Sequence, residues 1–232
     1  VLSKSQKIIA LLSDLADQGK IPRRCPIIVS SPTVAKLNQV HQRYLQQDAD
    51  AYYCPEFARR KNWRNPFDCP QFFYGSFASY EKKFGSIPRP AIFLVSSGMM
   101  DFAAALEMAQ DYLGDPASEF FVVGWQSPDS TGEAAMNLDE VVIKGNAIPV
   151  KATVRKFGQF SSHADLDMLL LNVSHYRGLK GVIVHHGEAV SAMNLAREIQ
   201  NEFGYPVFVP AFLDSLLLDR RSFLKVEHDL SP

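Results

Sequence analysis

The sequence lacks several features that would assign it to a common functional class. No apolar run approaches the roughly 18 to 20 residues of a membrane-spanning helix, and no Cys-x-x-Cys pair marks a structural zinc site. Neither a GxGxxG nor a GxxxxGKS/T loop is present, so the glycine-rich signatures of nucleotide binding are missing. The 24 Lys and Arg residues are balanced by 25 Asp and Glu, giving a net charge of -1. Any nucleic-acid-binding surface must therefore be local.

The cysteines and the N-terminal residues indicate an intracellular protein. Cys25, Cys54 and Cys69 are an odd number, and we interpret them as reduced, buried thiols of a cytoplasmic protein. Residues 1–20 alternate charged and apolar side chains, which predicts an amphipathic helix and not a signal peptide. Because the chain begins with Val1 in the run-up to this helix, we expect a fragment, a processed product or an edited sequence.

The pattern of apolar residues predicts an α/β fold with a real core, since 47% of the residues are hydrophobic. Strands followed by a tight turn and a helix recur along the chain. Residues 119–125 are expected to form a buried strand, and 139–160 short alternating strands with a turn at Gly145 and Asn146. Residues 50–76 show no sustained period and are expected to be irregular or partly helical. Other predicted elements are helices at 8–19, 32–47, 79–85, 164–176 and 188–203, a helix after Gly98 that ends near Gly114, and strands at 26–29, 91–95, 181–186 and 205–210.

Three loops follow predicted strands, and ligands of open α/β sheets bind at this edge. They are Ser30-Ser31-Pro32, Ser96-Ser97-Gly98, and residues 124–132, which end in Ser130-Thr131-Gly132. Hydroxyls and backbone N–H groups at helix starts suit a phosphate. The alternative is that Ser, Gly and Pro serve there as caps and turn formers.

Two histidines have positions that suit chemistry. His163 lies in FSSHAD immediately before a predicted helix, and His186 lies in VIVHHGE at the end of a predicted strand. Imidazole both ligates zinc and transfers protons near neutral pH. Strand alternation should send His185 and His186 in opposite directions, so that at most one faces a site. From the residues alone, a structural role for this pair stays open.

Five segments in this order resemble the β-CASP branch of metallo-β-lactamase-fold nucleases, which includes the cleavage and polyadenylation endonuclease and bacterial ribonuclease J. They are SSPTVAK, AIFLVSSGMM, FFVVGWQSPDSTGEA, IKGNAIPVKATVRKFGQFSSHAD and VIVHHGEAVSAMNLA. The resemblance spans nearly the whole chain. It implies a β-CASP domain with a parallel sheet flanked by helices at 1–160, and the C-terminal segment of a metallo-β-lactamase αββα domain at 161–232.

The resemblance also implies the chemistry. His163 matches a histidine that transfers a proton or stabilises phosphate at the reacting phosphodiester, and His186 matches a zinc ligand. The parent protein is expected to use two zinc ions to hydrolyse RNA, with DNA left open, in mRNA processing or decay. The residues expected to hold phosphate or nucleic acid are Ser31, Ser96, Ser97, Gly98 and Thr131.

The zinc-binding HxHxDH signature of the family is absent from this sequence. One histidine ligand cannot assemble a dinuclear centre, so we expect the isolated chain to be inactive and to lack tightly bound zinc. The missing N-terminal metallo-β-lactamase segment is then a required partner, and a homodimer is left open. The remaining histidines are interpreted as structural or surface residues: His41, His175, His185 and His228.

Two other functions remain in view. The first is a non-catalytic nucleic-acid-binding or scaffolding member of the same family, although retention of His163 and His186 argues against it. The second is a small-molecule or nucleotide-binding α/β domain. The basic and aromatic stretch at 58–67 could stack on and neutralise a nucleic-acid strand, or form a solvated insertion.

Overall fold

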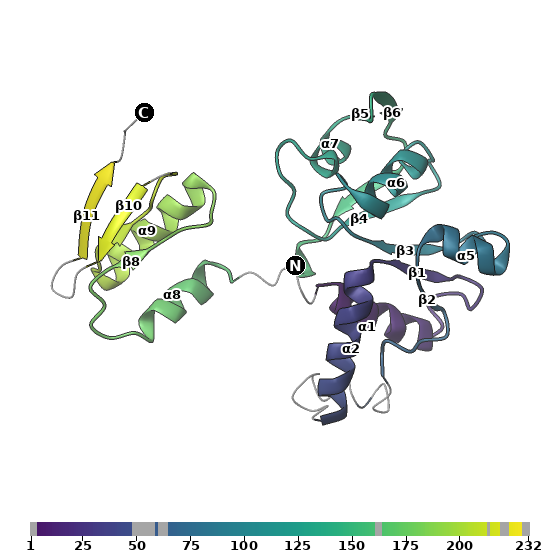
Figure 1. The fold of residues 1–232 in the computed structure, drawn as a ribbon, viewed down its shortest axis with the longest axis horizontal. Coiled ribbons are helices and arrows are strands. Elements are labelled where there is room, and N and C mark those ends of the chain that lie inside the picture. The colour runs from purple at the N-terminus through teal and green to yellow at the C-terminus, as the bar shows by residue number, and fades with distance from the viewer. Residues whose placement is uncertain are drawn as a thin grey trace. The chain divides into compact units, whose positions relative to one another are not determined.

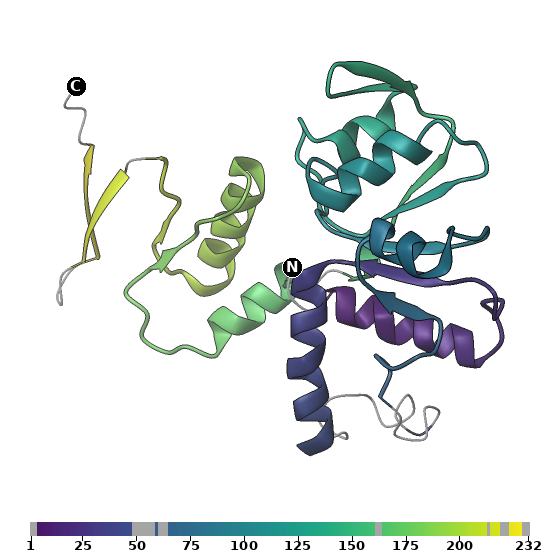
Figure 2. The ribbon, with the colours of Figure 1, turned by 45° about the vertical axis from the view of Figure 1, so that its right-hand side comes forward.

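The computed structural model describes residues 4–47, 59, 65–160, 164–212, 214–218 and 223–228, and it divides the chain into two compact units. The first unit is Val1–Ser162 and the second is His163–Pro232. Figures 1 and 2 show the helices and strands of each unit. The described part confirms the predicted α/β class.

The first unit contains two groups of strands. Its elements are α1 (Lys4–Asp17), β1 (Ile27–Ser30), α2 (Pro32–Gln47), β2 (Phe72–Tyr74), α5 (Phe77–Phe84), β3 (Ile92–Val95), α6 (Ala103–Tyr112), β4 (Glu119–Val122), α7 (Thr131–Asn137), β5 (Glu140–Ile143), β6 (Asn146–Pro149), β7 (Thr153–Lys156) and the 3₁₀ turn η1 (Gly158–Phe160). The second unit contains α8 (Leu166–Ser174), β8 (Val182–Ile183), α9 (Ala189–Phe203), β9 (Val207–Phe208), β10 (Asp214–Leu218) and β11 (Phe223–His228).

Strand β1 lies at the centre of a three-stranded parallel sheet, between β2 and β3. Ile27 and Ile28 point to opposite faces and are both fully buried, as expected for a parallel strand covered on both sides. Helix α1 packs on this sheet through Ile9 (Figure 1). Strand β2 was not predicted, because its three residues are all aromatic and show no alternation of apolar and polar side chains.

A second core lies between α6, α7 and the strands β4 to β7. The prediction of a buried strand at 119–125 is wrong in part. Strand β4 pairs with β7 and buries Val122, whereas Phe121 on the opposite face is 54% exposed, because the described core packs on one face. The hairpin turn also lies one residue earlier than predicted: Lys144 and Gly145 both have positive φ (51° and 80°), and Ile143 pairs with Asn146. Two left-handed residues in a two-residue loop form a type I′ turn.

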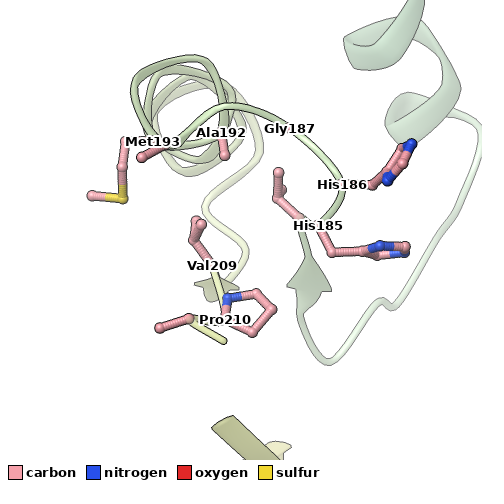
Figure 3. Close-up of a pocket in the computed structure, with 10 residues that line it drawn as sticks. His185, His186, Gly187, Ala192, Met193, Val209 and Pro210 are labelled. Carbon is pink, nitrogen blue, oxygen red and sulfur yellow. The ribbon is translucent and has the colours of Figure 1, made fainter. Parts of the chain in front are cut away.

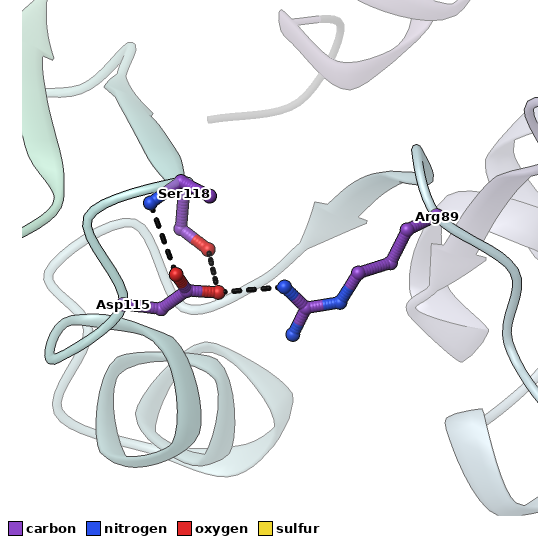
Figure 4. Close-up of polar contacts among 4 residues, drawn as sticks. Arg89, Asp115 and Ser118 are labelled. Carbon is purple, nitrogen blue, oxygen red and sulfur yellow. Dashed lines mark hydrogen bonds and ion pairs between the residues drawn. The ribbon is translucent and has the colours of Figure 1, made fainter.

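The segment between α6 and β4 is held by a carboxylate. Asp115 Oδ2 accepts a hydrogen bond from Arg89 Nη1 (2.8 Å) and another from Ser118 Oγ (3.3 Å), and its Oδ1 accepts one from the Ala117 backbone N–H (2.9 Å; Figure 4). The Ala117 amide and the Arg89 guanidinium lower the pKa of Asp115. These bonds set the direction in which the chain enters β4.

The second unit packs helices α8 and α9 on the parallel pair β8–β9 (Figure 1). Val184, Ala192 and Ile199 form its core. Both helices agree with the predicted ranges to within two residues. Helix α9 ends before Gly204, whose φ of 69° is left-handed. The strands are shorter than predicted, because β8 ends at Ile183 and β9 at Phe208.

Two of the three cysteines lie among the described residues. Cys25 and Cys69 are free and buried, which confirms their interpretation as buried thiols, and burial raises the pKa of Cys25. Cys54, and most of the basic and aromatic stretch at 58–67, lie outside the described residues. Among the described helices, none is both long and apolar enough to cross a membrane.

The buried edge of α2 makes the stability of the first unit sensitive to acid. His41 packs edge-on against Phe67, with ring centroids 6.0 Å apart, and burial lowers the pKa of His41 below 6.5. As the pH falls below 6.5, the unfolded chain binds this proton before the folded chain does, so the free energy of unfolding decreases as the pH falls. We expect urea unfolding at pH 7.5 and 5.5 to show a smaller loss of stability in His41→Gln than in wild type. An equal loss in both proteins would contradict the prediction.

Candidate functional site

The first two serine loops meet because β1 and β3 are parallel neighbours that end together. Ser30 pairs with Val95, so Ser31 and Ser96 follow at the same edge, and Ser96 Oγ donates to Ser31 Oγ at 3.2 Å. Ser31 Oγ also accepts from the Val34 backbone N–H (3.4 Å) at the start of α2, so Ser31 serves as the cap that the alternative interpretation foresaw. Ser31 is buried and Ser96 is exposed, so Ser96 is the hydroxyl that faces solvent.

The Ser97-Gly98 backbone is held from the third loop. Gln126 is 4% exposed, and its Nε2 donates to the carbonyl oxygens of Gly98 (2.7 Å) and Trp125 (3.0 Å). Ser97 Oγ is buried and has no hydrogen-bond partner among the described residues. A buried hydroxyl without a partner costs about 1–3 kcal/mol, so a ligand oxygen at this loop would remove a penalty. Gln126 was not predicted, because it follows the predicted strand 119–125 and its partner Gly98 lies 28 residues away in the sequence.

The third loop joins the segment that follows Ser96-Ser97-Gly98 through two of its backbone N–H groups. The Thr131 N–H donates to Asp101 Oδ1 (2.8 Å), and the Gly132 N–H donates to the Met99 carbonyl (2.9 Å). Ser130 caps α7 by accepting from the Glu133 N–H. The backbone N–H of Thr131 is therefore already bonded, and its hydroxyl is the group that the predicted phosphate contact would use. Asp101 was missed because its partner lies 30 residues away in the sequence.

His186 lies in the second unit, at the rim of a pocket of about 330 Å³ (Figure 3). Its φ is 64°, a left-handed conformation that non-glycine residues adopt rarely and that recurs at functional sites. Both His185 and His186 line this pocket and are exposed. The prediction that alternation would separate them is wrong, because β8 ends at Ile183 and both residues lie beyond it.

The predicted zinc ligand is His186, and the predicted catalytic residue, His163, lies outside the described residues. An exposed imidazole at a strand end fits a zinc ligand, but it supplies one donor of the several that a metal needs. No group of three or more His, Cys, Asp or Glu side chains in the described ranges is placed to hold a metal ion. The roles of His163 and His186 stay predictions.

His175 and His41 make contacts within their own units. His175 Nδ1 lies 2.6 Å from the Leu171 carbonyl at the end of α8, and its side chain is exposed. His41 packs in the first unit, as expected for a structural residue. The side chain of His228 lies outside the described part.

The comparisons with known proteins agree with this arrangement. The model of the Beta-Casp domain matches residues 5–134, more than half of the chain. The chain belongs to the β-CASP family. A second model, described as the Zn-dependent metallo-hydrolase RNA specificity domain, matches residues 147–210. That range contains His163 and His186. The resemblance predicted from the sequence is thereby confirmed.

Individual β-CASP relatives extend well beyond this chain. The cleavage and polyadenylation specificity factor subunit 3-II of Arabidopsis thaliana is 22% identical over 227 residues, covering 97% of this chain and 35% of that protein. Ribonuclease TTHA0252 of Thermus thermophilus is 26% identical over 200 residues (84% and 43%). The transcription termination factor FttA of Thermococcus kodakarensis is 25% identical over 227 residues (94% and 34%). The chain thus spans about a third to two-fifths of these relatives.

Proposed function

We propose that the protein containing this chain is a zinc-dependent phosphodiesterase that hydrolyses RNA in mRNA processing or decay. The observation that carries the proposal is the match of residues 147–210 to a metallo-hydrolase RNA specificity domain. Its support is the placement of His186, within that range, in a strained conformation at a pocket rim. A ribonuclease and a polyadenylation factor among the relatives agree with it.

In this proposal the chain supplies two parts of the enzyme. Residues 1–160 form the β-CASP domain, and residues 161–232 close a metallo-β-lactamase domain. The other zinc ligands come from residues outside this polypeptide, in an N-terminal metallo-β-lactamase segment, which agrees with the fraction of each relative that the chain covers. A cytoplasmic location, in keeping with the free thiols of Cys25 and Cys69, is part of the same proposal.

The histidines have separate roles. His186 donates a ring nitrogen to zinc from the turn between β8 and α9. Two zinc ions, when bound, supply an activated water and stabilise charge on the attacking and leaving oxygens. His163 gives a proton to the leaving oxygen or stabilises the phosphate.

The serine loops hold a flanking phosphate of the strand. Ser96 presents an exposed hydroxyl, Ser97 an unpaired one, and Gly98 an exposed backbone with space around its Cα. Ser31 positions Ser96 through the 3.2 Å hydrogen bond, and Thr131 adds a hydroxyl from the neighbouring loop. Since net charge gives no attraction, these local donors are what the strand meets.

The test uses the full-length protein and a 5′-labelled single-stranded RNA. We expect hydrolysis with zinc, loss of hydrolysis with a chelator, and recovery when zinc is restored. Single-stranded DNA of the same sequence decides between RNA and DNA. The 232-residue chain by itself should be inactive. RNA binding without hydrolysis by the zinc-loaded protein would refute the proposal and favour a non-catalytic family member.

A further inference from the structure

Lys4, the first residue of α1, carries a buried charge that no described carboxylate offsets. The residue is 6% exposed, and its Nζ donates a hydrogen bond to the Val123 carbonyl oxygen at 3.3 Å. Among the described residues, no Asp or Glu forms an ion pair with it. A buried ammonium that lacks an opposing charge is unfavourable, because the loss of its hydration is not repaid. An anion bound at this position would remove that cost.

The start of helix α1 adds positive potential at the same place. The first backbone N–H groups of a helix have no partner within it, and they make the N-terminus the positive end of the helix dipole. A lysine there is unfavourable for helix stability, and the first turn of α1 carries no acidic side chain to offset it. A neutral donor such as glutamine could make the hydrogen bond to Val123 equally well. The charge of Lys4 therefore indicates an anionic ligand.

Lys4 lies at the edge of the first unit where the serine loops follow their strands. Val123 comes directly after β4, so the Lys4 ammonium is at the carboxyl end of that strand. Three residues further on, the buried Gln126 reaches the loop after β3 and donates to the Gly98 carbonyl (2.7 Å). The residues that follow β4 therefore connect Lys4 with the loop Ser96-Ser97-Gly98.

We propose that Lys4 binds a phosphate of the RNA strand and supplies the positive charge that the serine loops lack. The inference rests on the proposed function, which brings a strand to Ser96, Ser97 and Gly98. Those residues offer hydroxyl and backbone donors without a formal charge, whereas hydrogen bonds between two charged groups are about twice as strong. A lysine binds phosphate as a point charge and does not read the bases, so the contact strengthens binding without selecting a sequence.

The test is the salt dependence of RNA binding by the full-length protein. Fluorescence anisotropy follows a labelled single-stranded RNA, in a His163→Ala background that is expected to silence cleavage. Lys4→Met keeps the apolar stem of the side chain and removes the charge. We expect it to weaken binding several-fold at low salt. The slope of log affinity against log salt concentration should fall by about 0.7, the value for one phosphate contact on a single strand.

Two further variants separate the charge of Lys4 from its place in the fold. Lys4→Arg restores the charge and should recover most of the salt slope. Lys7→Met removes an exposed lysine one turn further along α1 and should leave the slope as in wild type. In the protein that retains His163, Lys4→Met should raise KM and leave kcat unchanged, since a flanking phosphate is bound equally in the ground state and in the transition state.

Urea unfolding of the 232-residue chain gives an independent readout. Lys4→Met should unfold at the same urea concentration as wild type or at a higher one, because a buried charge without an opposing charge is replaced by an apolar side chain. A lower midpoint together with an unchanged salt slope would make Lys4 an anchor for the end of β4 and overturn the proposal. Destabilisation of the full-length protein alone would assign the anion to a carboxylate outside this chain, which would overturn it as well.

The phosphate contact and the nuclease assignment fail on different results. Cleavage of RNA with an unchanged salt slope in Lys4→Met would reject the contact and keep the nuclease. A reduced slope in a protein that binds RNA but cleaves none would uphold the contact and reject the nuclease. Absence of RNA binding by the full-length protein would reject both.

Discussion

His163→Ala in the full-length protein is expected to lower the rate of RNA cleavage by at least about 100-fold without changing zinc content, because a proton donor or phosphate-stabilising group is lost. His186→Ala is expected to lower the rate as far and to reduce bound zinc as well, since a metal ligand is removed. Single-turnover cleavage of labelled RNA and metal analysis of the same samples measure both effects.

A third substitution provides the control for this pair. His175 is exposed at the end of α8 in the same unit, and its Nδ1 lies against a backbone carbonyl of its own helix. His175→Ala should cleave RNA and retain zinc as wild type does. Full zinc content in His186→Ala, or wild-type cleavage in His163→Ala, would remove that histidine from its assigned role.

The strand pattern predicted that the serine loops lie at one edge of the sheet, but it did not predict which hydrogen bonds each serine makes. Parallel strands place their carboxyl ends at one edge, so Ser31 and Ser96 could be brought together from strand positions alone, and the hydrogen bond between them confirms this. The capping role of Ser31 was a known alternative. Which role a serine takes depends on the hydrogen-bond partners that the fold brings to it.

The residues that sequence reasoning missed depend on contacts over long separations or on backbone geometry. Gln126 and Asp101 act on loops 28 and 30 residues away, and no local pattern shows such pairs. The prediction that strand alternation separates His185 from His186 was wrong because β8 ends at Ile183, before both residues.

Gly132→Ala is expected to destabilise the first unit by about 2–3 kcal/mol, the cost of overpacking a filled site. A Cβ at this position would overlap Gln126 Oε1, lie 2.8 Å from its Cδ and 3.2 Å from the Met99 carbonyl oxygen. Gln126 cannot swing away cheaply, because its Nε2 is held by the carbonyls of Gly98 and Trp125. Urea unfolding followed by far-UV circular dichroism measures the loss, with Gly158→Ala as control, since its Cβ would meet no atom within 4 Å.

A double-mutant cycle tests whether the clash with Gln126 is the cause. In a Gln126→Ala background the overlapping amide is gone, so Gly132→Ala should cost less by about 1 kcal/mol or more, a coupling expected for residues in contact. An undiminished cost in that background would place the strain at the Met99 carbonyl instead.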